Sequence, residues 1–215
     1  MSVKLVSYTK PVLDGLETPV DLLSYIARVS NPDNQMNTAT GGKLLKSLIR
    51  MGHWSPLEMV DATIEIEAPR DISRQIIRHR SMSVQEFSQR YAEALGFSEP
   101  RECRLQDVKN RQNSLPCLDP ELTGWWERVQ REILASSNFY YQMALKKGIA
   151  KECARVILPE GLTMSRMYLK GSLRSWIHYL QSRTDVATQA EHRAIAVIIA
   201  GIIADLFHYP ELLAA

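Results

Sequence analysis

Apolar and polar residues alternate with two different periods along the chain, and these periods predict a mixture of strands and helices. Residues Lys4 to Thr9 alternate one by one, as a half-buried strand does, and Ala62 to Glu67 repeat this pattern. A third strand is predicted from Met164 to Lys170. Strands and helices follow no regular β-α-β order, which favours an α+β fold.

Helical spacing, with apolar residues three or four positions apart, recurs between these strands. A short helix is predicted after Asp71, which can cap it, with Ile72 and Ile76 facing inward. Gln75 and Arg78, three residues apart, share another face of this helix. Residues 97–120 have few periodic apolar positions and are predicted to be a long loop or lid. The other predicted helices are 22–29, 44–49, 125–147, 172–181 with Ser172 as its cap, and 189–207.

The composition is that of an ordinary globular protein. With 215 residues, 45% of them hydrophobic and 23% charged, the chain can bury a core as one domain, residues 1–215. A net charge of +2 is too small to indicate a nucleic-acid partner. The N-terminus lacks a signal-peptide core, and the longest apolar run, 194–204, has about half the length that spans a bilayer. We therefore expect no membrane association.

The cysteines also restrict the chemistry. Cys103, Cys117 and Cys153 are odd in number and lack C-x-x-C spacing, which argues against a disulfide framework and a zinc site. We expect no bound metal and a reducing, cytoplasmic location. Cys117 has no basic neighbour in the sequence to activate it as a thiolate, so we do not expect it to be a nucleophile.

The segment from Arg78 to Tyr91, RHRSMSVQEFSQRY, is the strongest chemical signal in the chain. Between Arg70 and Arg90 there are five arginines and no lysine. Arginine presents a rigid fork of donors that suits phosphate and carboxylate groups, and it stacks on flat rings. The segment is therefore either an exposed basic turn or part of a pocket for a planar, phosphorylated ligand.

Four segments, in this order, carry a family resemblance. They are His53-Trp54-Ser55-Pro56-Leu57-Glu58, the pattern R-H-R-x7-S-x-R-Y from Arg78 to Tyr91, Ala154 to Pro159, and Leu173 to Arg183 followed by Gln189 and Glu191. Together they resemble the motifs of flavin-dependent thymidylate synthases over nearly the whole chain. The resemblance implies a central, mostly antiparallel sheet flanked by helices. No G-x-G-x-x-G follows a strand, so a Rossmann dinucleotide site is not expected.

The resemblance also assigns binding residues. Arg183 would be the catalytic residue, because its cation would stabilise negative charge on a uracil ring. The residues implied for dUMP are Gln75, Arg78, Glu86, Ser88, Gln89, Arg90, Arg155 and Arg183. The residues implied for FAD are His53, Ser55, Arg78, His79, Arg80, Glu86, Ser172, Arg174 and His178. Without the resemblance, Arg155 could be a surface cation pairing with Glu152, and Arg183 a cation at a helix end.

The implied reaction is the reductive methylation of dUMP to dTMP without a cysteine nucleophile. Methylenetetrahydrofolate would donate the carbon, FAD reduced by NADPH would supply hydride, and the enzyme would be a homotetramer with sites at subunit interfaces. Two other classes stay open. The apolar last helix suits a non-catalytic oligomeric scaffold. A nucleic-acid-binding module would use Arg74, Arg78, Arg80, Arg90, Arg101, Arg104 and Arg111.

Overall fold

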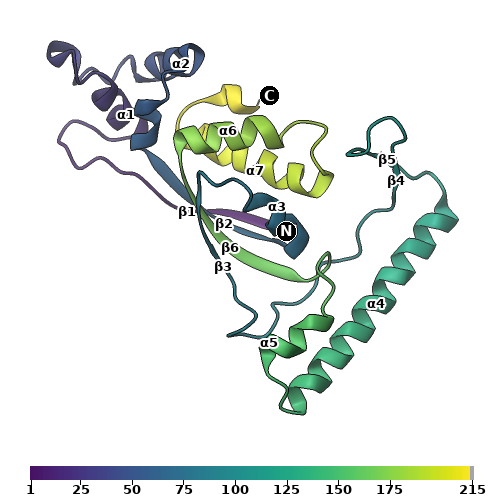
Figure 1. The fold of residues 1–215 in the computed structure, drawn as a ribbon. Helices are drawn as coiled ribbons and strands as arrows, with labels where there is room; N and C mark the ends of the chain where they lie inside the picture. Colours follow the sequence, from purple (N-terminus) through teal and green to yellow (C-terminus); the bar gives the residue numbers. More distant parts are fainter. Residues whose placement is uncertain (214–215) are drawn as a thin grey trace.

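The structure, a computed structural model, describes residues 1–213, and the predicted domain boundary at residue 215 lies outside this range. Its centre is a four-stranded sheet in the order β1-β2-β6-β3, in which every neighbouring pair is antiparallel (Figure 1). The predicted α+β fold with an antiparallel sheet is therefore confirmed. The strands are β1 (Ser2–Tyr8), β2 (Asp61–Pro69), β3 (Ser83–Glu86) and β6 (Met164–Ser172).

The central pair, β2 and β6, separates a buried face from a polar face. All nine residues of β2 pair with β6, from Asp61 opposite Ser172 to Pro69 opposite Met164. On the inner face, Ile64 lies opposite Leu169 and both are fully buried. On the outer face, the Arg166 guanidinium bonds the Glu67 carboxylate at 2.7 Å. This alternation is the pattern by which the strands were predicted, because each strand turns every second residue to the core.

Helices cover the inner face of the sheet. In Figure 1, α6 and α7 lie together over it, and α3 follows directly from β2. Trp176 of α6 is fully buried and donates its indole N–H to the carbonyl of Ala62 at 3.2 Å. The helices that contribute to this core are α1 (Pro19–Ala27), α2 (Gly41–Met51), α3 (Arg70–Ile76), α6 (Leu173–Arg183) and α7 (Ala190–Leu206). Among residues 1–213, no helix combines the length and the apolar character that crossing a bilayer requires.

Residues 97–146 form an arm that extends from the rest of the molecule (Figure 1). The prediction of a long loop or lid over 97–120 missed the hairpin β4 (Arg104–Gln106) and β5 (Ser114–Pro116), while the rest of residues 98–119 is irregular as predicted. These three-residue strands are too short for an alternating pattern to be visible in the sequence. The hairpin leads into the 27-residue helix α4 (Pro120–Lys146), which ends before Gly148 as predicted.

Two predicted helix details were wrong. Asp71 does not cap α3, because it lies in the first turn, and its carboxylate instead receives both terminal nitrogens of Arg101, at 2.7 and 2.5 Å. Helix α1 ends at Ala27, and Val29 beyond it is 69% exposed. In contrast, Ser172 caps α6 as predicted, since its hydroxyl accepts the backbone N–H of Ser175.

Helix α7 contains a histidine inside the core. His192 is fully buried, and its Nε2 lies 3.1 Å from the hydroxyl of Tyr179 on α6. Burial, followed by the nearby charges of Arg183 and His79, lowers the pKa of His192 to about 4. His192 is therefore neutral in the folded protein at neutral pH.

This histidine makes stability depend on pH. Its folded pKa lies below the ordinary value near 6.5, so its contribution is complete above pH 6.5 and is lost as pH falls toward 4. Between pH 6.5 and pH 4 we expect the free energy of unfolding to fall in both proteins. The fall should be larger in the parent than in His192→Asn, by on the order of 2–3 kcal/mol. Chemical denaturation of both proteins at several pH values measures the difference. Parallel curves for the two proteins would contradict this expectation.

Candidate active site

The arginine-rich segment 78–91 folds against α6. Between α3 and β3 it makes a turn in which Met82 is buried, and the carbonyl of Ser81 accepts the hydroxyl of Ser175 at 3.2 Å. Gly171 permits this approach, because a Cβ there would lie 3.2 Å from Cγ of Met82. The segment is thus a turn that these contacts fix against α6, followed by the edge strand β3. Arg78 and Arg80 are exposed on this turn.

Arg183 and His79 meet where α6 ends. The Nε–H of Arg183 donates to Nε2 of His79 at 2.9 Å. Burial, and then the Arg183 charge, lowers the pKa of His79, which keeps the imidazole neutral and able to accept this bond. The contact fixes the guanidinium through one nitrogen and leaves its two terminal nitrogens for a ligand. Within residues 1–213, Arg183 forms no ion pair.

A cavity of about 570 Å³ opens beside Arg183. Gln75, from α3, lines the same cavity, and so does Gln189 at the start of α7. Two residues that the resemblance implies for dUMP, Gln75 and Arg183, therefore lie at one cavity. The remaining lining residues are Gln112, Gln181, Ser182, Asp185, Ala187 and Thr188.

Gln75 belongs to a chain of hydrogen bonds. Its Oε1 lies 3.2 Å from Nδ1 of His192, and its Nε2 lies 2.7 Å from Oε1 of Gln189. Gln189 in turn donates to Glu191 at 2.9 Å, and Arg104 from β4 bonds the same carboxylate at 2.6 Å. Sequence reasoning assigned no site role to Tyr179 or His192. Available signals were the position of His192 three residues before Ile195 and seven before Ile199, which marks it as core-facing.

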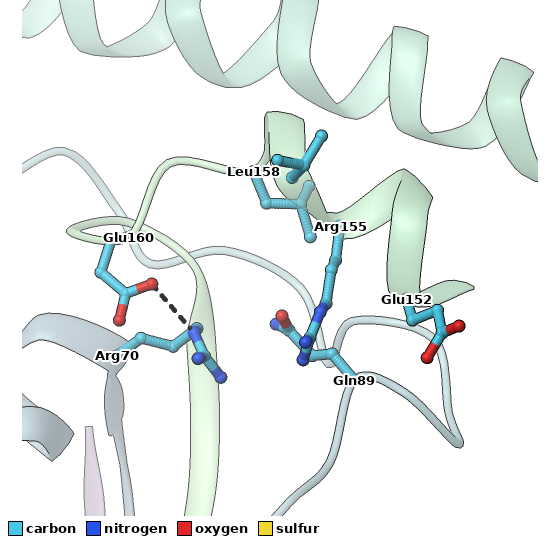
Figure 2. A pocket seen from close by; sticks show the side chains of 7 residues that line it. Arg70, Gln89, Glu152, Arg155, Leu158 and Glu160 are labelled. Atoms are coloured by element: carbon cyan, nitrogen blue, oxygen red, sulfur yellow. Dashed lines mark hydrogen bonds and ion pairs between the residues drawn. The ribbon is translucent and has the colours of Figure 1, made fainter. Parts of the chain in front are cut away.

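A second cavity, of about 360 Å³, lies between the segment after β3 and the turn after α5 (Lys151–Ala154), as Figure 2 shows. Arg155 and Gln89 both line it, and in Figure 2 their side chains point toward each other. Gln89 is only 3% exposed, and its Nε2 has no hydrogen-bond partner among the described residues. A buried donor without a partner is costly, so this amide is suited to a ligand that completes it.

The neighbours of this second cavity are partly committed to ion pairs. Glu152 pairs with Arg90 at 3.0 Å and forms no ion pair with Arg155 within residues 1–213. Arg70 pairs with Glu160 at 3.1 Å, as the dashed line in Figure 2 marks. The Ser88 hydroxyl accepts the backbone N–H of Arg90 at 3.3 Å, which places Ser88 and Arg90 beside Gln89 on one turn.

Glu86, which the resemblance implies for both dUMP and FAD, is engaged within the chain. Its carboxylate accepts hydrogen bonds from both terminal nitrogens of Arg74, at 3.0 and 3.3 Å, and from the hydroxyl of Ser165 at 2.8 Å. Only 16% of its side chain is exposed. In this arrangement Glu86 anchors β3 to α3 and β6.

Residues implied for FAD gather where the turn η2 (Ser55–Met59) meets α6. Trp54 packs its ring edge-on against His178, with the ring centres 4.5 Å apart. Arg174 bonds Glu58 at 2.9 Å, and the Ser172 hydroxyl together with Arg174 lowers the pKa of Glu58 against the opposing effect of burial. This cluster comprises His53, Ser55, Ser172, Arg174 and His178, with His53, Ser55 and His178 exposed.

The structure does not bring all the residues implied for dUMP to one place. Gln75 and Arg183 line the first cavity, Gln89 and Arg155 line the second, and the two cavities share no lining residue. Each cavity is open to solvent and presents one part of the implied set. Among residues 1–213 there is no group of three or more histidine, cysteine, aspartate or glutamate side chains arranged to hold a metal ion.

Comparison with known proteins shows which relatives this chain and its fold resemble. The chain is 50% identical over 218 residues to the flavin-dependent thymidylate synthase of Synechocystis sp., covering 100% of this chain and 99% of that protein. It is 48% identical over 196 residues to the probable flavin-dependent thymidylate synthase of Paramecium bursaria Chlorella virus 1, covering 91% and 90%. The crystal structure of the UMP/dUMP methylase PolB from Streptomyces cacaoi, bound with 5-Br dUMP, superposes with a TM-score of 0.80 at 25% identity, covering 95% and 90%.

The family model described as thymidylate synthase complementing protein matches residues 4–207. This range contains both cavities, the Arg183–His79 contact and the cluster at η2 and α6. By this match and by the identities above, the chain belongs to the thymidylate synthase complementing protein family.

Proposed function

We propose that this protein is a flavin-dependent thymidylate synthase, which converts dUMP to dTMP with methylenetetrahydrofolate as the carbon donor. One observation carries the proposal: each of two separate cavities is lined by residues that the family resemblance assigns to the same nucleotide. The family membership and the relatives named as flavin-dependent thymidylate synthases support it. The solved UMP/dUMP methylase with a bound dUMP analogue supports dUMP as the substrate.

The two cavities suit the two ends of dUMP. Arg155 supplies a fork of donors and Gln89 an unpartnered amide, which match the oxygens of a phosphate. Gln75 and Arg183 supply amide and guanidinium groups that match the oxygens and the N–H of a uracil ring. Since the cavities share no lining residue, we propose that one nucleotide is bound between the first cavity of one copy and the second cavity of another.

Arg183 would act on the ring electrostatically. Its cation would stabilise negative charge on uracil and thereby raise the electron density at C5, the carbon that receives the methyl group. His79 contributes by accepting the Nε–H of Arg183, which fixes the guanidinium in place. The guanidinium then does not have to reorganise as negative charge develops on the uracil ring.

The cluster at η2 and α6 fits a flavin dinucleotide in its chemistry. Arg174 supplies charge for a pyrophosphate, the hydroxyls of Ser55 and Ser172 supply hydrogen bonds, and His53 and His178 supply flat rings. With Arg78, His79, Arg80 and Glu86 these are the residues that we propose for FAD. When bound and reduced by NADPH, FAD would supply the hydride for the reaction.

A cysteine nucleophile is not part of the proposal. Cys117 follows β5 in the arm, where its thiol lies 3.8 Å from the carbonyl of Asp119. Burial, and then a hydrogen bond with Cys117, raises the pKa of the neighbouring Cys103 thiol. The region thus favours thiol over thiolate at Cys103, whereas a nucleophile requires the thiolate.

The geometry gives less support to a nucleic-acid-binding module. Of the seven arginines that such a module would use, four are paired with carboxylates. Paired arginines contribute little to an open cationic surface. The four pairs are Arg74 with Glu86, Arg90 with Glu152, Arg101 with Asp71, and Arg104 with Glu191.

Helix α4 supports assembly into the proposed homotetramer. Of its 27 residues, only Gln130 and Tyr141 are buried. Phe139 and Tyr140 are 59% and 63% exposed, and Trp125 is 50% exposed. Soluble monomers seldom expose so many large apolar side chains on one helix, so contact with another copy would account for them.

The first test replaces Arg183 by alanine. We expect turnover to fall by about a hundredfold, because a preorganised charge opposite the ring would be lost, while FAD stays bound and the fold survives. Arg183→Lys should rescue poorly, because a point charge cannot reproduce the fork. The control is Arg50→Ala, which removes another cation from the last turn of a helix. An Arg183→Ala protein that retains FAD and forms dTMP within threefold of the parent rate would refute the role.

The second test concerns Cys117. We expect Cys117→Ala to form dTMP at close to the parent rate, because no covalent bond to this sulfur is required. Mass spectrometry of protein quenched during turnover should find no adduct of dUMP on the parent chain at this residue. Finding such an adduct would overturn the cysteine-free mechanism.

The third test concerns assembly. We expect the double substitution of Phe139 and Tyr140 by serine to shift the sedimentation profile toward smaller species and to reduce activity in parallel. Glu132→Ser, an exposed change on the same helix, is the matched control. A fully active monomer in the sedimentation experiment would rule out a site formed between copies.

A further inference from the structure

The hydrogen-bond chain through Gln75 has a defined direction, and Glu191 sets it. Burial opposes ionisation of Glu191, but its own backbone N–H, Gln189 and Arg104 outweigh burial and lower its pKa. The ionised carboxylate can only accept hydrogen bonds. One oxygen of Glu191 accepts a hydrogen bond from Arg104 at 2.6 Å. The other oxygen must also face a donor, which is the Nε2–H of Gln189 at 2.9 Å.

Every further bond in the chain follows from this first one. With Nε2 committed to Glu191, Gln189 presents its Oε1 to Gln75, which must then donate from its own Nε2, at 2.7 Å. The Oε1 of Gln75 consequently faces His192, which donates from Nδ1. His192 then has an unprotonated Nε2, and this nitrogen accepts the hydroxyl of buried Tyr179 at 3.1 Å.

Gln75 is left with one free N–H and one free oxygen lone pair, since an amide offers two donors and two acceptor sites. Both belong to a side chain that lines the cavity of Arg183. We propose that the partly buried chain from Glu191 to Tyr179 locks the polarity of the Gln75 amide, so that Gln75 reads the imide edge of uracil and rejects cytosine. Gln189, Glu191 and His192 are positioning residues in this proposal, because they act on the ligand through Gln75.

Uracil and cytosine present opposite donor and acceptor patterns at this edge. Uracil presents a carbonyl acceptor next to the N3–H donor, which pairs with the N–H and oxygen of the locked amide. Cytosine presents an amino donor next to an N3 acceptor, so both contacts become donor to donor and acceptor to acceptor. A site built to hydrogen-bond one pattern rejects a ligand that leaves its polar groups unpaired. The inference rests on the proposed function, because it takes dUMP as the ligand of this cavity.

Glu191→Gln should reverse the direction of every hydrogen bond in the chain without changing the size or shape of the side chain at position 191. Arg104 holds the carbonyl oxygen of the new amide, so the NH₂ group turns toward Gln189 and each amide along the chain flips. His192 would then accept at Nδ1 and carry its proton on Nε2. Nitrogen-15 spectra of histidine-labelled protein report this tautomer directly and require no ligand.

The binding measurement uses calorimetry on flavin-loaded protein with dUMP and dCMP as probes. We expect the parent to prefer dUMP strongly and Glu191→Gln to lose at least tenfold of this preference, with dUMP weakened and dCMP strengthened. Glu127→Gln, which neutralises an exposed carboxylate paired with Arg131 on α4, is the matched control and should keep the parent preference.

Two substitutions of His192 provide a second test if Glu191→Gln does not fold. His192→Asn places an amide N–H at the position of Nδ1 and should keep the lock on Gln75. His192→Gln reaches only the position of Nε2, so it can keep the contact with Tyr179 but not the donor to Gln75. We expect the preference for dUMP to survive in His192→Asn and to fall in His192→Gln.

The outcomes separate this inference from the proposed function. An unchanged tautomer in Glu191→Gln overturns the directed chain, and a switched tautomer with an unchanged nucleotide preference overturns the reading role of Gln75. A parent protein that binds no dUMP refutes the proposed function and the reading role together, while the tautomer experiment still tests the chain. A switched tautomer accompanied by a reduced dUMP preference supports the proposal.

Discussion

The register between β2 and β6 is the constraint on which the rest of the structure depends. Each strand continues without a loop into a helix, β2 into α3 at Arg70 and β6 into α6 at Leu173. Because the strands are antiparallel, these helices start from opposite ends of the pair, and the ends of α3 and α6 meet through the bond between Arg183 and His79. A slip of one residue would turn the buried row of one of the two strands outward and move its helix by about 3.3 Å against the other.

Arginine is divided between two roles in this fold. Several arginines hold elements together through carboxylates, such as Arg74, which ties α3 to the carboxylate of β3, and Arg101, which ties the arm to α3. Others, such as Arg183 and Arg155, line cavities and form no ion pair within the described part of the chain. The sequence left an exposed basic turn and a ligand pocket as alternatives for the segment from Arg78 to Tyr91, because both kinds of arginine share one chemistry. Only the positions of acidic residues far along the chain separate them.

Hydrophobic periodicity and the residues that start and end elements sufficed to predict β1, β2 and β6 of the four-stranded sheet, the long helices and the cap at Ser172. They failed for β3, β4 and β5, which are too short to show a period, and for Asp71, whose partner Arg101 lies 30 residues away. The resemblance supplied the site residues, and the structure gathers them into separate groups. It could not supply the partners of Gln75, because its bonds to Gln189 and His192 span more than 100 residues. A pattern read along the chain carries no information about which distant polar groups face each other in a core.

Helix α4 has a consequence for how the protein reaches its folded state. The buried anchors of this helix are two polar side chains, Gln130, which bonds the backbone of Arg101, and Tyr141, whose hydroxyl accepts the N–H of Ala94. Isolated helices gain little from their own hydrogen bonds and depend on packing of an apolar face. Since the apolar side chains of α4 have little to pack against in their own chain, the proposed homotetramer would couple helix formation here to encounter with a second copy. In that assembly the final step of folding would be governed by mass action, so that the helical content of a dilute chain and that of a concentrated one would differ.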